Sequence, residues 1–547
     1  MKSFTLLAAA ALASTAALAS PVSQSEALAY ANAYVSNILA SDRVATIAEP
    51  LAFGSATPMY VVSLAPQGWV IIAADDVLDP IIGYSLTGSL SAESVSDNLY
   101  AYLGHFAEDA EVAIARGDGK SAAWTTDTIA HTNKAASSVA PLIDVEWNQT
   151  GKYRQSCPTS ASKGDAIVGC VAVGLGQAMS HYRKPDRPVG YMSYNSANYG
   201  TLSVDYDAEP AYDWKQIIAA QNSDNDGVEC ARFLYHCGVA VSMDYGPDGS
   251  GVTYMGNVPY ALKTFFGYSN KITNVKKSNY TKDEWVALLK GELSAGHPLI
   301  YAGYSTSGGH CFNVDGYDAS GLFHFNFGWG GNGNGYLGIS SHEYNSGEMC
   351  TLNLAPATGA PISISASKTS VSKGLAEGVE VATLSTETDM DGCSFTYEVA
   401  GVVNPVTSVV SDPAFTLDGD RLITNSVFAK NYKSSSKARS VSINVTSTNA
   451  SNGLSLTAKL TFNLTDANAL PEIDAAGISV SQSVGSVTVS AGDSPVCVSL
   501  VSPAGVSLGV RNISACESAS FSGLAPGLYV LSFTGSDLSS AMRVLVK

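Results

Sequence analysis

The spacing of apolar positions changes along the chain and predicts a different kind of structure in each stretch. Residues 20 to about 134, which we call the N-terminal segment, show helical spacing after Ser23 and Ser25, either of which can cap a helix. Residues 59–64 and 68–73 alternate like the strands of a hairpin. The segment is therefore predicted to hold two helices around a strand pair. The second helix runs from Asp97 to Arg116, with these residues on one side: Leu99, Leu103, Phe106, Ala110 and Val112.

Residues 135–356, which we call the middle segment, are richer in aromatic residues and glycine. A helix is predicted to begin at Cys170 and to stop before Pro185. A strand is predicted to begin at His310 with Phe312 and Val314 facing the core, and a turn over 315–321 leads to a strand that brings Asn326 and Trp329 beside it. The middle segment is thus expected to mix helices and strands.

Beyond Ala357 the chain alternates Ser, Thr and Val with turn residues between the runs, which is typical of β-sandwiches. A break near Pro471 divides this part into residues 357–470 and 471–547, each long enough for one sandwich. At 547 residues the chain is also long enough for roughly three or four domains.

Two stretches do not follow either pattern. The apolar run from Phe4 to Leu18 predicts a secretory signal peptide over residues 1–19, and it is shorter than the roughly 20 residues that a membrane span needs. No later run is apolar and long enough to span a membrane, so a soluble protein outside the cytoplasm is expected. Residues 117–138 are small and polar, which predicts an exposed linker open to cleavage.

Charge and cysteine content exclude some classes of function. The formal net charge is −18 with only 14% charged residues, which argues against nucleic acid as a partner. The nine cysteines lack the paired short spacings of a zinc site, so no metal and no cofactor is expected. An odd number of cysteines in an exported chain leaves at least one thiol unpaired.

The candidate chemistry comes from a cysteine and a histidine. Cys170 lies in the first turn of its predicted helix, where free backbone N–H groups and the helix dipole favour a thiolate. A buried structural cysteine explains that segment equally well. His310 follows two glycines that let the backbone approach a substrate, and its separation from Cys170 matches the spacing of papain-like sites. The pair therefore predicts a nucleophile and its general base.

The middle segment resembles the streptopain family of papain-like cysteine peptidases, including relatives in Bacteroides and Prevotella. The similar stretches are 147–149, 169–172, 243–247, 308–310 and 326–330. The resemblance implies an α+β papain-like catalytic domain in which Cys170 attacks the scissile carbonyl and His310 moves the proton. It also implies that Gln149 helps to form the oxyanion hole.

Three further expectations follow from the same resemblance. Asn326 or Trp329 orients His310, and the backbones of Ser250 and Gly309 contact the substrate. The family usually has Trp directly after the asparagine, whereas this chain has Phe327, which keeps an aromatic shield but loses an indole N–H. The choice between Asn326 and Trp329 therefore stays open.

The ends of the chain carry weaker resemblances. Residues 68–76 and 81–85 are similar to the inhibitory propeptide of the family, which implies that residues 20–134 are an α+β propeptide acting as an intramolecular inhibitor. Residues 524–532 and 543–547 are similar to the sorting domain of the type IX secretion pathway, which implies a secreted or bacterial cell-surface protein.

The expected function is that of a secreted cysteine endopeptidase, made as a zymogen, that cleaves proteins and peptides. Two alternatives remain from the residues themselves. A transglutaminase-like acyltransferase would also use Cys170 and His310, with Asp315 as a third member, and would transfer the acyl group to an amine. A non-catalytic surface adhesin is suggested by the β-rich C-terminal third, and it would be indifferent to loss of Cys170.

Overall fold

The computed structural model describes residues 19–124, 137–305, 308–340, 346–402, 410–465, 477–502, 505–535 and 538–546. The predicted signal peptide, most of the predicted linker and the predicted break near Pro471 lie outside these residues. The chain divides into two compact units after Thr358, close to the predicted end of the middle segment. The finer domain limits stay predictions.

The N-terminal segment holds more strands than its sequence pattern predicts. Strands β2 and β3 are the expected antiparallel hairpin, but β1 and β4 extend it on both sides. Strand β1 escapes the alternation rule because its burial pattern is irregular and it contains a proline. The elements are α1 (Gln24–Asn37), β1 (Val44–Phe53), β2 (Ala56–Ala65), β3 (Trp69–Ala73), β4 (Ile81–Ser85), α2 (Asp97–Arg116) and η1 (Ala122–Trp124).

The two predicted helices are present with the predicted starts. Ser23 caps α1 in a capping box with Glu26. Helix α2 has the predicted bounds, but Val112 is 39% exposed, so its place on the buried side was wrong. Ala113 is buried instead, because the helical repeat that runs through Leu103, Phe106 and Ala110 next returns to the same side at residue 113.

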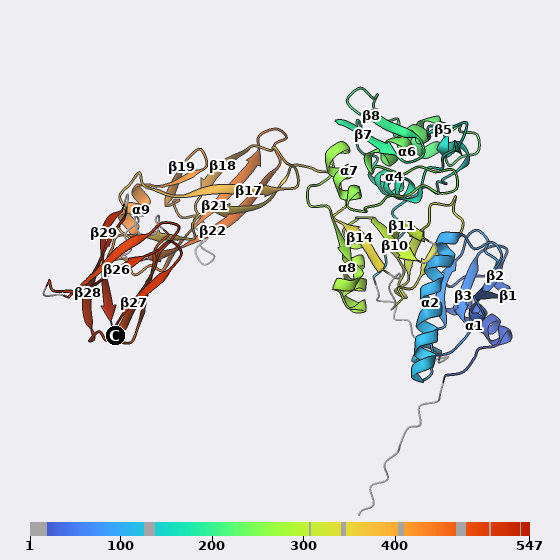
Figure 1. Cartoon of the computed structure of the whole chain (residues 1–547), viewed down its shortest axis with the longest axis horizontal. Helices are drawn as coiled ribbons and strands as arrows, with labels where there is room; N and C mark the ends of the chain where they lie inside the picture. The colour runs from blue at the N-terminus through green and yellow to red at the C-terminus, as the bar shows by residue number, and fades with distance from the viewer. Residues whose placement is uncertain are drawn as a thin grey trace, which may run out of the picture. The chain divides into compact units, whose positions relative to one another are not determined.

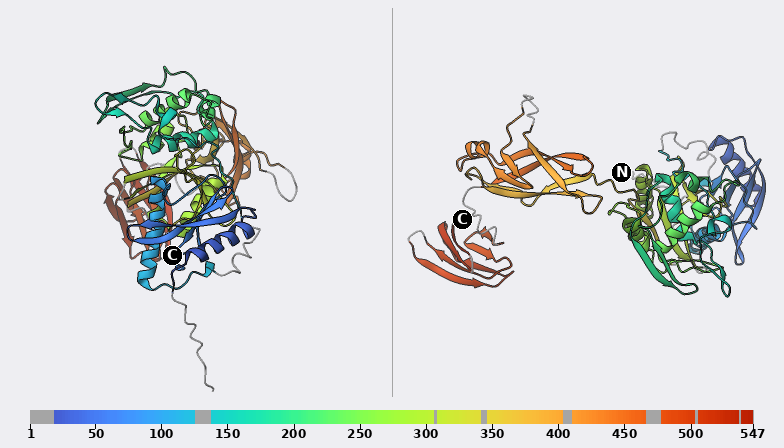
Figure 2. Two further views of the ribbon diagram at one scale, coloured as in Figure 1. Left: turned by 90° about the vertical axis from the view of Figure 1, so that its right-hand side faces the viewer. Right: turned by 90° about the horizontal axis from the view of Figure 1, so that it is seen from above.

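Helices α1 and α2 cover opposite faces of these four strands. Val62, Val70 and Ile72 pack with α1 on one face. Val61, Trp69 and Ile71 face the other way, into the core that contains α2. The period of two along the strands thus gives the N-terminal segment two apolar layers. In the view from above in Figure 2, the blue strands of this segment lie at one margin of the first unit.

The described residues of the middle segment combine five α-helices with a continuation of the same sheet. The ten strands run in the order β1-β2-β3-β4-β13-β12-β11-β10-β14-β9. Two small hairpins, β5–β6 and β7–β8, lie apart from it. The elements are η2 (Gly151–Arg154), β5 (Thr159–Ser160), β6 (Gly164–Asp165), α4 (Cys170–Tyr182), β7 (Tyr191–Ser196), β8 (Gly200–Asp205), α5 (Trp214–Ala219), α6 (Val228–Ala240), α7 (Asn257–Phe265), β9 (Thr273–Lys276), η3 (Lys277–Asn279), α8 (Lys282–Ser294), β10 (Leu299–Ser305), β11 (Gly308–Tyr317), β12 (Phe323–Asn326), β13 (Gly335–Leu337) and β14 (Ser346–Leu352).

Strand β11 separates two cores. Cys311 faces the core built around α4 and α6, whereas Phe312 and Val314 face the core that contains α2 and α8. Figure 1 shows β10 and β11 between α4 on one side and α8 on the other. The strand runs two residues past Asp315, so the predicted turn over 315–321 begins too early and Asp315 belongs to the strand.

The N-terminal segment joins the middle segment through backbone pairing as well as side chains. Strand β4 pairs with β13, with Tyr84 opposite Tyr336 and Gly83 opposite Leu337. The ring of Tyr102 on α2 packs edge-on against Phe312 at 5.9 Å between centroids, and its hydroxyl donates to the carbonyl of Gly338 at 2.7 Å. The two segments therefore share one sheet and one core.

The second unit contains the two predicted β-sandwiches, each with its own core. The first pairs a sheet in the order β15-β17-β20-β19 with one in the order β16-β22-β21-β18, and the second pairs β23-β24-β27 with β26-β25-β28-β29. The elements are β15 (Pro361–Ala366), β16 (Ser370–Ser372), β17 (Glu380–Thr388), β18 (Phe395–Ala400), β19 (Phe415–Asp418), β20 (Arg421–Thr424), α9 (Ser426–Asn431), β21 (Ser440–Asn449), β22 (Ser455–Thr465), β23 (Ser479–Ser483), β24 (Ser486–Ser490), β25 (Val496–Val501), β26 (Ser507–Ile513), β27 (Ser518–Ser522), β28 (Gly527–Thr534) and β29 (Ser539–Val546).

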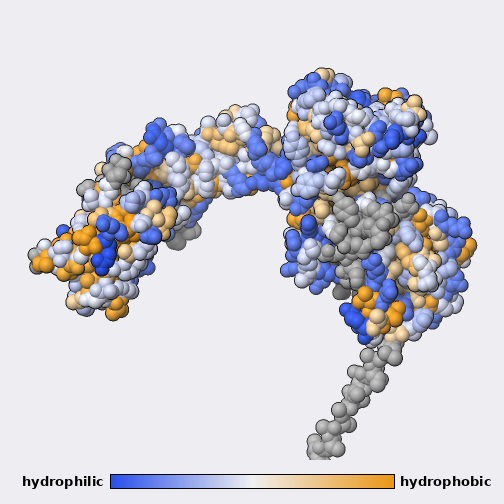
Figure 3. Space-filling model, in the orientation of Figure 1, coloured by the Kyte–Doolittle hydropathy of each residue, from blue (hydrophilic) through white to orange (hydrophobic). Residues whose placement is uncertain are grey.

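The last sandwich carries several large apolar side chains on its surface, visible as orange atoms in Figure 3. Leu508 and Val510 on β26 are exposed, and so are the paired residues Leu528 and Leu545 on β28 and β29. Within the described residues, no helix has both the length and the apolarity to cross a membrane.

Candidate active site

Cys170 is the first residue of α4, as predicted from its sequence. The residue before it, Gly169, has a φ of 89°, and a Cβ at that position would lie 2.9 Å from the side chain of Met243. Glycine is required there because a side chain would meet both the unfavourable backbone conformation and this contact. The tight entry into the helix sets the thiol at its N-terminal end.

Burial raises the pKa of the Cys170 thiol, and backbone hydrogen bonds to the sulfur act in the opposite direction. The groups that contact the sulfur belong to the backbones of Cys311, Val171 and Cys170 itself. We expected the helix terminus to favour a thiolate, and these N–H groups do so. Desolvation is the larger effect in this form of the chain, so the neutral thiol is favoured.

His310 lies near the start of β11 and faces the same small pocket as Cys170. Strand β10 pairs with β11 so that Gly303 lies opposite His310 and Ala302 lies opposite Cys311. The pocket has a volume of about 110 Å³, and its lining includes Cys170, His310 and Cys311. The structure therefore brings the predicted nucleophile and the predicted base to one cavity.

Gln149 lies near the start of α4, because it forms a backbone hydrogen bond with Val168. It is 3% exposed, its backbone N–H donates to the side chain of Asn148, and its carbonyl accepts from Val168 at 3.0 Å. It is not among the residues that line the 110 Å³ pocket. The backbone bond to Val168 nevertheless ties Gln149 to the residue two places before Cys170.

Asn326 and Trp329, the two residues expected to orient His310, make different contacts in the structure. Asn326 lies opposite Asn313, three residues beyond His310 and so about 10 Å along the strand. Its amide donates to the carbonyl of Val145 at 2.8 Å and accepts from Gln177 at 3.1 Å. Trp329 packs against the core on the α2 side, and its buried indole N–H has no hydrogen-bond partner. An orienting role for either residue therefore has no support in this form of the chain and stays a prediction.

Sequence reasoning placed Gln177 on the helix but gave it no role. Its fully buried side chain donates to Asn326 and to the carbonyl of Val145, and it accepts from the amide of Asn313 at 3.1 Å. These bonds fasten α4 to β11 and β12. The signal in the sequence was a glutamine seven residues after Cys170, two turns further along the same side of the helix.

Phe327 does not lie over an Asn326–His310 pair as an aromatic shield. Its ring packs against Phe312 at 5.2 Å and stacks with Phe325, in the core shared with α2. The replacement of the usual tryptophan therefore affects the face of the sheet that contacts the N-terminal segment.

Of the two predicted substrate-binding residues, Gly309 lines the pocket and Ser250 does not. Gly309 is exposed. Ser250 is mostly buried, and its hydroxyl donates to the carbonyl of Ile167 at 2.7 Å and accepts from the backbone of Gly246 at 3.1 Å. Ser250 thus ties its loop to the segment before α4, and Gly251 is the part of that loop that lines the pocket.

Asp315 does not serve as a third member of a Cys170–His310 site. One carboxylate oxygen lies 2.6 Å from Nδ1 of His324, and the other accepts from the backbone N–H of Ile143 at 2.8 Å. The residue is also five positions beyond His310 on the same strand. The geometry therefore contradicts the arrangement suggested for a transglutaminase-like site.

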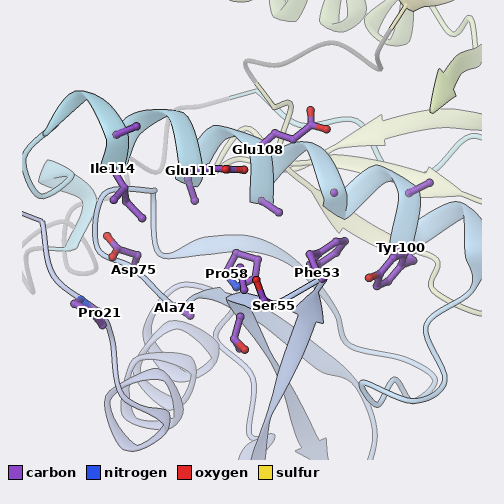
Figure 4. Close-up of a pocket in the computed structure, with 18 residues that line it drawn as sticks. Pro21, Phe53, Ser55, Pro58, Ala74, Asp75, Tyr100, Glu108, Glu111 and Ile114 are labelled. Atoms are coloured by element: carbon purple, nitrogen blue, oxygen red, sulfur yellow. The ribbon is translucent and has the colours of Figure 1, made fainter. Parts of the chain in front are cut away.

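A larger cavity of about 960 Å³ lies within the N-terminal segment. Figure 4 shows it between α2, which contributes Tyr100, Glu108 and Glu111, and the chain around Phe53 and Pro58. None of its lining residues belongs to the middle segment. The larger cavity is therefore separate from the candidate chemistry, whose pocket is small.

Two family models match this chain. Residues 147–337 match the Peptidase C10 family, and residues 19–110 match the Spi protease inhibitor. The chain is 32% identical over 291 residues to the thiol protease/hemagglutinin PrtT of Porphyromonas gingivalis, a match that covers 50% of this chain and 33% of that protein. It is 27% identical over 308 residues to streptopain of Streptococcus pyogenes, covering 52% of this chain and 75% of that protein.

Among solved structures, a fragment of prointerpain A from Prevotella intermedia is similar, with 26% identity and a TM-score of 0.49. That match covers 57% of this chain and 99% of the fragment. The chain spans only a third of the length of the Porphyromonas protein it matches.

Proposed function

Because residues 147–337 match the Peptidase C10 family and place Cys170 and His310 on one pocket, we propose that this protein is a cysteine endopeptidase. The observation that carries the proposal is the common cavity of the first residue of α4, Cys170, and a histidine near the start of β11, 140 residues further along the chain. Cofactor chemistry is not needed for this reaction, since the thiol and the imidazole supply the nucleophile and the proton carrier.

The residues define the steps of peptide hydrolysis. His310 takes the proton of Cys170, the sulfur attacks the scissile carbonyl, and the proton passes to the leaving amine. The backbone N–H of Cys170, at the free end of α4, and the side chain of Gln149 stabilise the oxyanion. Water then resolves the acyl-enzyme. Gly309 and the loop that ends at Gly251 hold the substrate backbone beside the pocket.

We further propose that the chain is made as a zymogen and that the N-terminal segment keeps it latent. Support comes from the match of residues 19–110 to a protease inhibitor and from the contact of Tyr102 with Phe312, two residues after His310. Among the described residues before the middle segment, none lines the pocket at Cys170. The segment is therefore proposed to act from the far face of β11, through the position of that strand, rather than by filling the pocket.

We propose that the protein acts outside the cytoplasm, on the bacterial surface or in the medium, on protein and peptide substrates. This rests on the apolar run over 4–18 and on the terminal β-sandwich, which resembles a type IX sorting domain. Detection of the processed chain in the medium of the producing cells, beginning at Ser20 or later, tests the location.

The activity is tested by labelling. After cleavage within residues 117–138, a thiol-directed epoxide should modify one residue, Cys170, and abolish hydrolysis of a fluorogenic peptide in proportion to labelling. An unlabelled chain carrying Cys170→Ala provides the control. Full activity of that variant would overturn the assignment and favour an adhesin or another catalytic centre. Faster release of acyl product with an added amine than with water would favour the acyltransferase instead.

A further inference from the structure

The pocket beside Cys170 contains a second thiol that the proposed peptidase mechanism does not use. Cys311 is 2% exposed and lines the same 110 Å³ cavity. All nine cysteines are free in this structure, so neither thiol is engaged in a disulfide. A nucleophilic cysteine therefore lies next to an uncommitted one.

The contacts place Cys311 within one helical turn of Cys170. The backbone of Cys311 hydrogen-bonds the sulfur of Cys170. A Cβ added at Gly174 would lie 3.3 Å from the Cys311 sulfur. Residues 170 and 174 are four apart on α4, so they lie on the same face of the helix. Both sulfurs therefore lie over one turn of α4.

Several features around the pair are small or flexible enough to allow a bond. Ala302 and Gly303 line the cavity from β10, opposite Cys311 and His310. Gly174 leaves room beneath the Cys311 sulfur where another residue would crowd it. A disulfide requires its two Cα atoms to be about 4.4–6.8 Å apart, and α4 and β11, which carry the two cysteines, are in direct contact.

We propose that Cys311 is a resolving cysteine that protects the Cys170 thiol from irreversible oxidation. Hydrogen peroxide oxidises the Cys170 sulfur to a sulfenic acid and is reduced to water. The Cys311 sulfur then attacks the sulfenic sulfur, an S–S bond forms, and the S–OH oxygen leaves as a second water with the Cys311 proton. A dithiol reductant returns both residues to thiols. The proposal goes beyond peptide hydrolysis but rests on the reactive thiol assigned there to Cys170.

A disulfide between Cys170 and Cys311 would prevent further oxidation of the Cys170 sulfur. A sulfenic acid that meets no thiol is oxidised further to sulfinic and sulfonic acids, which dithiols do not reduce. An enzyme outside the cytoplasm meets oxidants without a cytoplasmic reducing system. Formation of the 170–311 bond would store the nucleophile in a recoverable form.

The test uses the full chain in a Cys350→Ala background. Trypsin leaves Cys170 alone in peptide 164–183, whereas peptide 291–368 contains both Cys311 and Cys350. Cys350 lies on β14 in the core on the other side of the sheet, so its removal simplifies the map without touching the pocket. The chain is treated with hydrogen peroxide at mildly alkaline pH, alkylated, digested and analysed by mass spectrometry.

The expected product is peptide 164–183 linked to peptide 291–368, lost after reduction. When Cys311→Ser is added, we expect no link and a several-fold higher fraction of sulfinic and sulfonic acid at Cys170. Cys311→Ala is tested beside it, with circular dichroism as the check on folding. Equal irreversible oxidation with and without Cys311, no oxidation of Cys170, or a link from Cys170 to another cysteine would each overturn the proposal.

The map needs no turnover, so it is independent of the assay for peptidase activity. A linked pair in a chain whose Cys170→Ala variant still hydrolyses peptides would overturn the proposed function and leave the disulfide standing. A missing link in a chain that Cys170→Ala inactivates would do the reverse.

Discussion

At the scale of single residues, two opposing effects determine whether Cys170 is present as a thiol or a thiolate. Backbone N–H groups favour its thiolate, while burial favours the thiol. The helix position of Cys170 could be predicted because Gly169 and the apolar repeat mark the start of α4. The dominance of burial could not, since it depends on how β11 covers the sulfur. The Gln177 network was also out of reach, because its partners Asn313 and Asn326 meet it only after the sheet has formed.

Replacement of the two reacting groups should give equal losses. We expect Cys170→Ala and His310→Ala each to reduce peptide hydrolysis by the same large factor, because nucleophile and base act as a unit. The double variant should be no slower than either single one, as measured by kcat/KM after cleavage of the linker. A double variant much slower than both would mean that the two residues act independently.

Gln149 should matter through its N–H donor rather than through its size. We expect Gln149→Ala to lower kcat by about 10- to 1000-fold, the usual effect of removing one oxyanion donor. Gln149→Glu keeps the shape but replaces the donor by an acceptor, so it should be at least as slow. If Gln149→Glu retained full activity, another group would have to fill the oxyanion hole.

The raised pKa of Cys170 predicts how the uncleaved chain responds to pH. Only the thiolate is alkylated, and a pKa above the ordinary value of 9.0 means that the thiolate fraction still increases where an ordinary thiol has levelled off. Alkylation of Cys170 by iodoacetamide, followed by peptide mapping, should therefore be slow at neutral pH and continue to accelerate above about pH 10, where a thiol with the ordinary pKa has nearly levelled off. A rate that is already at its plateau at neutral pH would show that the thiolate is the stable form.

At the scale of elements, the contact between α2 and β11 is the feature that pattern alone did not predict. Both α2 and the β2–β3 hairpin were predicted from local periodicity, which is fixed within a few residues. The pairing of β4 with β13 joins residues about 250 positions apart, so no local pattern reports it. The same holds for the core that Tyr102 shares with Phe312.

Tyr102 offers a graded test of latency. Tyr102→Phe removes the hydrogen bond to the Gly338 carbonyl and keeps the ring, whereas Tyr102→Ala also removes the ring that packs on Phe312. We expect basal peptide hydrolysis by the uncleaved chain to increase slightly in the first variant and several-fold in the second. Tyr100→Ala, on the side of α2 that faces the 960 Å³ cavity, is the matched control. An increase no greater than in that control would count against action through β11.

At the scale of the whole molecule, the proposed catalytic residues and the C-terminal sandwiches belong to different units. Within the part of the chain that the structure describes, the cores around Cys170 and β11 contain no buried residue beyond Thr358, and the sandwich cores contain none before it. The alternation of Ser and Val predicted both sandwiches because one face of each strand is buried within its own module. The sequence pattern does not explain the exposed apolar residues on the last sandwich.

Truncation after Thr358 should therefore preserve the chemistry. We expect the truncated chain, after cleavage of the linker, to hydrolyse a short fluorogenic peptide with kcat/KM within about twofold of the full chain, because no core residue is removed. The thermal transition of the first unit should also be unchanged in calorimetry. A large loss of activity or of thermal stability would mean that the second unit supports the first.

The continuous sheet has a consequence for what a cut in the linker accomplishes. Strands β1 to β4 are joined to the middle segment by β-pairing and by a shared core. Cutting a peptide bond in the linker disrupts neither of these contacts. Cleavage therefore releases a tether rather than a contact. It replaces a high effective concentration of the inhibitor by its actual concentration, so rebinding becomes second order. Under the proposed latency, the specific activity of the cleaved enzyme would increase on dilution alone. At a high enzyme concentration, the cleaved N-terminal segment would stay bound and inhibition would persist.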